Sequence, residues 1–355
     1  MSVWQSTEFD NHEQVCCFSD AETGLRAVVA VHSTALGPAA GGTRFQPYAT
    51  DDMAMDDALR LSRAMSYKCA LAGLPVGGGK AVIIGDPGHL KSEKLLTVFG
   101  RFIDRIGNVF ATGEDVGFSV ADVETMQRVT PYAAGTSRDA GDPSIHTAMG
   151  VLHGLHAVAE YRFDRNDLRG MKVAIQGLGS VGWRVARHLH DLGCQLIVAD
   201  VDEAKVAKAR AEFGAQAVTT NEIHAADVDI FCPCALGGVI SQQTMPEIRA
   251  RAIAGAANNQ LASAKAGEML HARKILFAPD YVINAGGIVS GMEAMQAMPG
   301  RKSADVAPLA ERLAWINTRL LEIFIRSHDE ARPPEVIAQT MAEELIGRAP
   351  AKVLA

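Results

Sequence analysis

The sequence has little that would attract a polyanion or a membrane. Its 34 lysines and arginines are outnumbered by 41 aspartates and glutamates, which gives the 355 residues a formal net charge of −7 at pH 7. Because nucleic-acid binding needs clustered cations, this balance argues against a nucleic-acid partner. No apolar run approaches the roughly 20 residues that a membrane-spanning helix requires. We therefore expect neither a nucleic acid nor a membrane as partner.

Signals for export, disulfide formation and metal binding are also missing. The opening segment, MSVWQSTEFDNHEQ, contains no basic stretch followed by an apolar one, so we expect no signal peptide. The six cysteines have no regular spacing, which favours reduced, buried thiols and a cytoplasmic protein. Cys232 and Cys234 form a Cys-Pro-Cys pair, but no second cluster completes a tetrahedral zinc site. We expect no metal.

The chain contains no internal repeat or low-complexity tract, and its local pattern changes once. The first third predicts a strand at 24–33, a helix at 54–73, a chain break at glycines 77–79, a strand at 81–84 and a helix at 92–105. Residues 134–144, AGTSRDAGDPS, are dense in turn formers and predict an interdomain hinge. Beyond them, short apolar strands alternate with helical stretches, as in a parallel, doubly wound sheet. Two final helices are expected, at 309–327 and from the proline pair Pro333-Pro334.

A glycine motif in the second half predicts a dinucleotide site. Gly177-x-Gly179-x-x-Gly182 directly follows an apolar strand and begins a helix. Gly177 makes the tight turn, Gly179 lets the backbone approach a pyrophosphate, and Gly182 lets the helix pack closely on the strand. The start of the helix, at Ser180 and Val181, supplies N–H donors to the phosphates.

An acidic residue after the next strand indicates which dinucleotide binds. Asp200 ends that strand and should accept hydrogen bonds from the adenosine ribose hydroxyls. Asp202 and Glu203 follow, and no arginine stands nearby to bind a 2′-phosphate. The expected cofactor is therefore NAD rather than NADP.

The stretch LPVGGGKAVIIGDP places a lysine after three glycines, although it is not a phosphate-binding loop. Such a loop needs Ser or Thr after the lysine, and here Lys80 is followed by Ala81. A lysine in a desolvated pocket, with a second cation nearby, has its pKa lowered and becomes a usable general base. Lys68, on the preceding helix, is the candidate second cation; the alternative is a solvated helix charge.

The third charged candidate is Asp115, in FATGEDVGFS. A carboxylate in a glycine-flanked loop after an apolar pair is typical of a strand end that faces a cleft. A helix N-cap or an Asx turn is an equal alternative on local sequence. Two lysines, one aspartate and a nicotinamide could together act on a substrate that carries a carboxylate and an amine.

These residues carry a resemblance to the glutamate/leucine/phenylalanine/valine dehydrogenases, over almost the whole chain and in the expected order. LPVGGGKAVIIGDP matches the active-site signature of that family position by position. The other matching segments are LGPAAGGTR (36–44), GEDVG (113–117), QGLGSVG, AGAANNQLA (254–262) and APDYVINAGG (278–287).

The resemblance implies a two-domain α/β enzyme with its active site in the cleft. It implies an N-terminal catalytic domain with a mixed sheet, at 1–134, completed by C-terminal helices at about 325–355. A Rossmann NAD-binding domain at 145–324 would follow a hinge at about 134–145. The implied reaction reversibly converts an L-amino acid to its 2-oxo acid and ammonia, while NAD takes the hydride. The family forms dimers to octamers, so a homo-oligomer is expected.

The roles implied by the resemblance are specific. Lys80 would activate the attacking water, Asp115 would shuttle protons to and from the substrate nitrogen, and Lys68 would pair with the α-carboxylate. The backbone at Gly41 and Gly42 and an asparagine of the pair Asn258-Asn259 would assist Lys68. On the cofactor side, the resemblance implies contacts from Thr147, Ala235, Asn258 and Asn284.

The substrate side chain is expected to be hydrophobic. Glutamate-specific members hold the distal carboxylate with a lysine where this chain has Ala40, and an unpaired buried carboxylate is costly. Met65 and Ile288 would line the pocket beside Ala40. Gly113 and Gly291 stand where leucine-type members carry alanine and valine, which predicts extra room for a large aliphatic or aromatic side chain such as that of phenylalanine, tryptophan or leucine. The alternative is that Met292 and Met295 fill this space and leave a leucine or branched-chain enzyme.

Two rival functions come from other classes. A non-catalytic NAD-binding sensor would keep the glycine motif and Asp200, but it would have no use for Lys68, Lys80 and Asp115 together. A 2-hydroxy-acid dehydrogenase would rely on a His/Arg pair, and no histidine here stands in a comparable motif. Both readings are therefore disfavoured.

Overall fold

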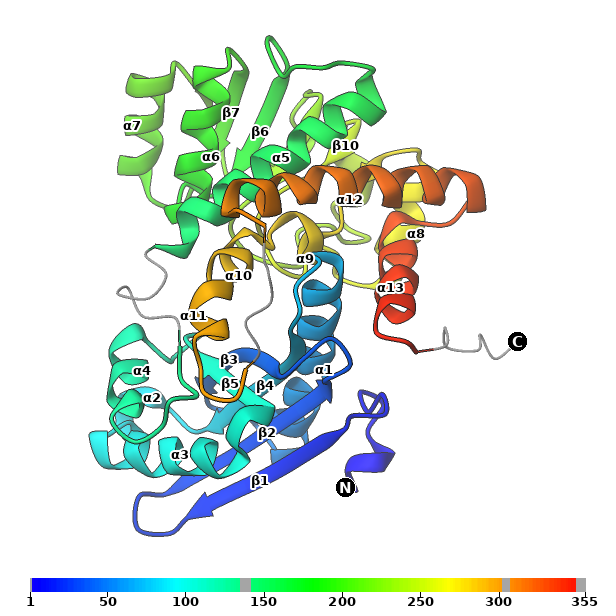
Figure 1. Cartoon of the computed structure of the whole chain (residues 1–355). Coiled ribbons are helices and arrows are strands. Elements are labelled where there is room, and N and C mark those ends of the chain that lie inside the picture. Colours follow the sequence, from blue (N-terminus) through cyan, green and yellow to red (C-terminus); the bar gives the residue numbers. More distant parts are fainter. Residues whose placement is uncertain (1, 135–141, 302–306, 349–355) are drawn as a thin grey trace. The chain divides into compact units, whose positions relative to one another are not determined.

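The computed structural model describes residues 2–134, 142–301 and 307–348, which form two compact units (Figure 1). The first unit comprises residues 1–142, 290–306 and 342–355. The second comprises residues 143–289 and 307–341. Each unit is built around one sheet, as the expected two-domain α/β fold requires.

The first unit contains a mixed sheet of five strands in the order β1-β2-β4-β3-β5. Antiparallel pairs join β1 to β2 and β2 to β4, whereas β3 is parallel to both β4 and β5. The strands are β1 (Gln14–Asp20), β2 (Leu25–Ser33), β3 (Ala39–Gln46), β4 (Gly77–Ile84) and β5 (Phe110–Gly113). The helices are α1 (Asp51–Leu71), α2 (Pro87–Leu90), α3 (Glu93–Ile106), α4 (Val120–Gln127) and α11 (Met292–Gln296). The predicted strand at 24–33 and the helices at 54–73 and 92–105 are confirmed.

Alternating apolar residues bury both faces of this sheet. Val29 of β2 and Ile83 of β4 pack with the apolar stripes of α3 and α4 in one cluster. Val28 and Val82, on the opposite face, pack with Ala58 of α1 in another cluster. Because side chains alternate along a strand, every second residue of β4 faces α1.

We expected the glycines 77–79 to break the chain, but they form the first three residues of β4. A Cβ at Gly78 would collide with the backbone nitrogen and hydroxyl of Ser66 on α1. A Cβ at Gly79 would lie 2.5 Å from the ring of Phe110. The glycines are therefore needed so that a helix and a ring can pack directly on the strand backbone.

The second unit contains a parallel sheet of six strands, and its strand order is β11-β10-β9-β6-β7-β8. Counted along the unit, this is the order 3-2-1-4-5-6 of dinucleotide-binding sheets, read from β8. The strands are β6 (Lys172–Gln176), β7 (Gln195–Ala199), β8 (Gln216–Ala217), β9 (Ile230–Pro233), β10 (Ala252–Ile253) and β11 (Leu276–Phe277). The helices are α5 (Pro143–Phe163), α6 (Ser180–Asp191), α7 (Glu203–Phe213), α8 (Ala264–Ala272), α9 (Asp280–Ile283), α10 (Gly286–Ser290), α12 (Leu309–Glu330) and α13 (Pro334–Leu345), of which α10 and α13 end in the first unit.

The division into units differs from the expected bounds in two places. Residues 325–341 belong to the second unit instead of completing the first, because the whole of α12 packs along α5, with the rings of Tyr161 and Phe324 5.3 Å apart. Residues 290–306 belong to the first unit, where Arg301 donates to the carbonyl of Ala39 at 3.1 Å. Most of the predicted hinge, residues 135–141, lies outside the described residues.

Helix α13 buries an acidic side chain in the second unit. Glu335, in its first turn, fills the space beside Gly267 of α8, where a Cβ would collide with the carboxylate. Within the described ranges, Oε2 of Glu335 has no hydrogen-bond partner. Burial, followed by repulsion from Glu268, raises the pKa of Glu335 from 4.5 to about 7. The ionised carboxylate is therefore a cost to the fold.

We predict that Glu335→Gln stabilises the protein at alkaline pH but not at pH 4.5. Between pH 4.5 and 7 the unfolded chain loses this proton while the folded chain keeps it, so the stability contribution falls as pH rises and the full cost is present above pH 7. Replacing the carboxylate should then recover about 1–3 kcal/mol at pH 8. Thermal unfolding followed by circular dichroism measures the change, with Glu160→Gln, at an exposed position of α5, as the control. An equal shift at both pH values would contradict this account.

Candidate active site

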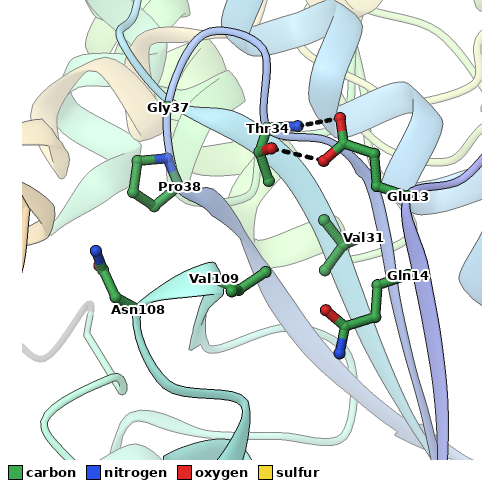
Figure 2. Close-up of a pocket in the computed structure, with 8 residues that line it drawn as sticks. All are labelled: Glu13, Gln14, Val31, Thr34, Gly37, Pro38, Asn108 and Val109. Carbon is green, nitrogen blue, oxygen red and sulfur yellow. Dashed lines mark hydrogen bonds between the residues drawn. The ribbon is translucent and has the colours of Figure 1, made fainter.

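A pocket of about 520 Å³ lies in the first unit, but it is not where the predicted site residues gather. Figure 2 shows its lining, from the beginning of β1 to the turn before β5. There the carboxylate of Glu13 accepts hydrogen bonds from the backbone nitrogen and hydroxyl of Thr34, at 2.8 and 2.6 Å. None of its eight lining residues was predicted at the site: Glu13, Gln14, Val31, Thr34, Gly37, Pro38, Asn108 and Val109.

The two predicted catalytic residues meet in the first unit. Lys80 lies two residues before Val82 on β4, so it faces α1, and it is 7% exposed. Its Nζ lies 2.5 Å from Oδ2 of Asp115. Asp115 follows the end of β5 by two residues, which confirms the predicted strand-end position.

A short turn fixes Asp115 beside β3. Asp115 and Phe118 exchange two backbone hydrogen bonds, at 3.1 and 2.9 Å. Gly117, at the left-handed φ of +72°, packs on the carbonyl of Phe45, and the backbone nitrogen of Phe45 donates to Val116 at 2.8 Å. Gly42 of β3 leaves room for this turn, because its Cβ would lie 2.9 Å from the Cβ of Asp115. Predicted glycines therefore position the carboxylate.

The electrostatics of the pair favour exchange of a proton. Burial lowers the pKa of Lys80, although the charge of Asp115 acts in the opposite direction. Burial would raise the pKa of Asp115, but the charges of Lys80 and Arg44 outweigh it and lower that pKa. The amine therefore gives up its proton more readily than a surface lysine does, as a general base requires.

Arg44 is a charged residue of this site that sequence reasoning missed. Its Nε lies 3.3 Å from Oδ2 of Asp115, and its Nη1 donates to Oδ2 of Asp57 at 3.0 Å. The available signal was its place in the GGTR segment, two residues after Gly42 on β3, since alternate residues share a face.

The predicted substrate residues of α1 lie over the same face of the sheet. Met65 is 3.4 Å from the Cβ position at Gly41, and its neighbour Ser66 packs on Gly78. Lys68 is half-buried one turn later, in the last turn of the helix. Ala40 is buried on β3, opposite Gly78 of β4. Lys68, Lys80 and Met65 thus share the α1 side of the first sheet.

Gly113 does not add the room that we expected. A methyl group there would lie 2.8 Å from the backbone oxygen of Ala134, so the space beside Gly113 is already filled by the chain itself. Gly291 is the N-cap of α11, where Met292 and Met295 are buried. Ile288 is half-buried on α10 in the second unit.

The glycine motif of the second unit has the predicted geometry. Gly177 adopts a φ of +95° and packs against Ala235, whose Cβ lies 2.7 Å from the Cβ position of the glycine. A Cβ at Gly182 would collide with the carbonyl of Gly177, so α6 passes close to the loop. By contrast, a Cβ at Gly179 would meet nothing within 4 Å. The start of α6 at Ser180 is therefore open to an incoming phosphate.

Asp200 is tied to this loop. Its carboxylate accepts the backbone N–H of Leu178 at 2.5 Å and that of Asp202 at 2.9 Å. The side chain is thus held at the end of β7, beside the glycine motif. Its remaining lone pairs are available for ribose hydroxyls.

The other predicted cofactor residues include Asn284 and Thr147, which lie near the turn before α10. Asn284 donates to Oδ1 of Asn258 at 2.7 Å and to the carbonyl of Ala256 at 3.1 Å. In the described part of the chain, its buried Oδ1 has no hydrogen-bond partner. Thr147 lies in α5, 3.0 Å from the Cβ position of Gly287.

The asparagine pair is exposed at the surface of the second unit. Asn259 has a left-handed φ of 51°, and its carbonyl accepts the backbone N–H of Gly238 at 2.7 Å. Asn258 is bonded through its side chain to Asn284. The open Gly179 and the unpaired amide oxygen of Asn284 both fit a dinucleotide, one at the pyrophosphate and one at a hydrogen-bond donor such as a carboxamide.

The described part of the chain carries neither a metal-binding cluster nor a membrane-spanning helix. The ranges 2–134, 142–301 and 307–348 hold no group of three or more His, Cys, Asp or Glu side chains arranged for a metal ion. Sγ of Cys232 lies 3.6 Å from Sγ of Cys234, so the pair shares one side of the strand end. None of the described helices is long and apolar enough to cross a bilayer.

Comparison with known proteins identifies the relatives of this chain. Residues 12–138 match the family model of the Glu/Leu/Phe/Val dehydrogenase dimerisation domain, and residues 198–345 match that of the glutamate/leucine/phenylalanine/valine dehydrogenases. A leucine dehydrogenase of Geobacillus stearothermophilus is 42% identical over 98% of this chain and 94% of its own. A valine dehydrogenase of Streptomyces virginiae is 43% identical over 94% and 93% of the two chains.

A solved structure agrees with these sequence relatives. The crystal structure of L-tryptophan dehydrogenase from Nostoc punctiforme superposes with a TM-score of 0.84 and 42% identity, over 95% of this chain and 97% of that one. The comparison therefore covers both units of the chain. It includes the two sheets, the lysine–aspartate pair and the glycine loop. The chain belongs to the glutamate/leucine/phenylalanine/valine dehydrogenase family of pyridine-nucleotide-dependent amino acid dehydrogenases.

Proposed function

We propose that the protein catalyses the NAD-dependent, reversible oxidative deamination of a hydrophobic L-amino acid, of large aliphatic or aromatic type, to its 2-oxo acid and ammonia. The observation that carries this proposal is the buried contact of Lys80 with Asp115, 2.5 Å apart, in a family of amino acid dehydrogenases. A sensor without catalysis has no need for such a pair.

The chain's own residues supply binding and proton transfer. Lys68 and the backbone at Gly41 and Gly42 hold the α-carboxylate, and Asp115 takes and returns protons at the substrate nitrogen. Lys80, with its pKa lowered by burial, removes a proton from the attacking water and then stabilises negative charge on that oxygen. When bound, the nicotinamide ring accepts the hydride from the substrate α-carbon.

The second unit would bind the cofactor. Backbone N–H groups at Ser180 and Val181 would donate to the pyrophosphate, and Asp200 would accept hydrogen bonds from the adenosine ribose hydroxyls. Asn284, Asn258, Ala235 and Thr147 would line the nicotinamide side. The anionic Asp200 would repel a 2′-phosphate, which favours NAD over NADP.

The substrate pocket favours an uncharged side chain. Ala40 is buried and offers no countercharge, so a distal carboxylate would lose its hydration without compensation. Met65, in the first unit, would supply apolar contacts to the substrate side chain. The substrate roles of Gly291 in the first unit, and of Ile288 and Asn259 in the second, stay predictions. The filled space at Gly113 weakens the case for an aromatic over a leucine preference, and the relatives include enzymes named for leucine, valine and tryptophan.

A homo-oligomer between a dimer and an octamer is part of the proposal. The first unit matches a dimerisation domain. Among the described residues β1 pairs with β2 alone, so its other edge can pair with a second strand. A glutamate dehydrogenase of Thermus thermophilus, 22% identical to this chain, is a hetero-hexamer, and its likeness supports the fold alone. The cytoplasmic location stays a prediction.

We predict that Lys80→Met and Asp115→Asn each lower kcat by about 10² to 10⁴-fold. NADH binding, measured by fluorescence, should be unchanged because these residues lie outside the nucleotide-binding unit. Lys91→Met is the matched control, since Lys91 forms a similar ion pair with Asp122, at 2.6 Å, outside the site. Retention of activity in either site variant would refute the assignment.

We predict that Asp200→Asn raises the ratio of NADP to NAD use by about tenfold, equivalent to 1.4 kcal/mol. The amide keeps an acceptor for the loop but removes the charge that repels a 2′-phosphate. Steady-state kinetics with each cofactor measure the ratio, and Asp202→Asn, which alters the cap of α7, serves as control. A wild-type enzyme that prefers NADP would overturn this part of the proposal.

The substrate class is tested by a panel of L-amino acids. Following NADH at alkaline pH, we expect phenylalanine, tryptophan and leucine to be oxidised with higher kcat/KM than valine, and glutamate to be a poor substrate. Ammonia-dependent reduction of the matching 2-oxo acids checks the reverse direction. A tenfold advantage of leucine over phenylalanine would replace the aromatic preference with the leucine-type alternative.

A further inference from the structure

Asp115 is in contact with two cations. Its Oδ2 lies 2.5 Å from Nζ of Lys80 and 3.3 Å from Nε of Arg44. The guanidinium of Arg44 also donates through Nη1 to Oδ2 of Asp57, at 3.0 Å. Arg44 therefore bridges the active-site carboxylate to a second carboxylate on α1.

Helix α1 and the β3–α1 loop hold Asp57 in place. The hydroxyl of Tyr48 donates to its Oδ2 at 2.7 Å, and Nη2 of Arg60 donates to its Oδ1 at 2.6 Å. The side chains of Arg44 and Asp57 are only 20% and 11% exposed. With Nη1 held by Asp57, the guanidinium keeps Nε at ion-pair distance from the carboxylate of Asp115.

A guanidinium keeps its charge at every pH at which the enzyme works. A permanent cation beside a proton-exchanging pair opposes the protonated form of both partners. In agreement, the charge of Arg44 contributes to the lowered pKa values of Asp115 and Lys80.

The other ionisable groups near the pair do not take the place of Arg44 in lowering these pKa values. The anion Asp57 raises the pKa of Lys80, although it comes after Arg44 in effect. Glu114, the chain neighbour of Asp115, has a raised pKa because of burial and then the charges of Asp142 and Asp115. Tyr48 stays protonated, since burial raises its pKa far above the working range. Lys68 lies on the same face of the sheet, in the last turn of α1.

We propose that Arg44 is a positioning residue of the dehydrogenase reaction. Its permanent charge favours release of protons from the Lys80–Asp115 pair. Its hydrogen bond to Asp57 fixes the guanidinium, which in turn orients the Asp115 carboxylate. This role rests on the proposed function of the pair. It predicts that Arg44 acts on the pH dependence of catalysis and not on fold stability alone.

The test compares Arg44→Met with Arg60→Met in the full-length enzyme. Arg60 contacts the same Asp57 but not Asp115, so it is a matched control for loss of a cation from the cluster. The acidic limb of the pH profile of kcat/KM, which reports the free enzyme's base, is measured for each. We expect Arg44→Met to move the limb to higher pH by about one unit, because removing the cation raises the pKa of the base. Arg60→Met should leave the limb in place.

Arg44→Lys separates the effect of the positive charge from the orientation of the Asp115 carboxylate. Lysine keeps a cation but lacks the second arm that reaches Asp57, so we expect kcat to fall at least tenfold while the acidic limb stays near that of the wild type. This variant also provides the test if Arg44→Met does not fold, which thermal unfolding of all three variants will show.

The outcomes are distinct. An unmoved limb in folded Arg44→Met, a limb that moves equally in Arg60→Met, or unchanged kcat in Arg44→Lys would each overturn the role of Arg44. A wild-type enzyme that oxidises no L-amino acid would instead overturn the proposed function.

Discussion

The chemistry of this protein depends on the burial of one amine against one carboxylate. Burial of Lys80 destabilises its charged form and lowers its pKa. The contact with Asp115 stabilises the charged form and offsets part of that shift. The balance leaves an ammonium group that yields its proton easily. The close packing on β3 and β4 creates this burial, and the turn from Asp115 to Phe118 holds the carboxylate beside the amine.

The glycines are the main means of creating it. In β4 and β3 they let α1, a phenylalanine ring and the Asp115 turn approach the strand backbone more closely than any side chain would allow. Glycine weakens a strand, so this run is costly in an isolated sheet. The apolar clusters on both faces of the sheet offset that cost.

Part of this could be predicted from the sequence. The glycine motif, Asp200 and the alternating strands of the second unit depend on local spacing, and local spacing is visible in a sequence. Lys80 was predicted as a buried base because its neighbours are glycines and apolar residues. The family assignment followed from motifs spread over the whole chain.

The rest depends on contacts between distant segments. The role of Arg44 requires Asp57 and Asp115, which are 13 and 71 positions away in the chain, to converge on one guanidinium. The filled space beside Gly113 comes from the backbone of Ala134, which no pattern near Gly113 indicates. The unit boundaries differ from the expected ones at residues 325–341 and 290–306, because helical periodicity does not say which sheet a helix packs on.

The chain passes between its two units four times, and this affects how the protein can be made. The first unit includes residues near the C-terminus, where Arg348 donates to the backbone oxygens of Asp10 and His32, at 2.5 and 2.6 Å. During synthesis, the lysine-bearing sheet emerges from the ribosome before residues 307–341 of the second unit, and residue 348, which packs on the sheet, is made after them. The second unit can fold in between.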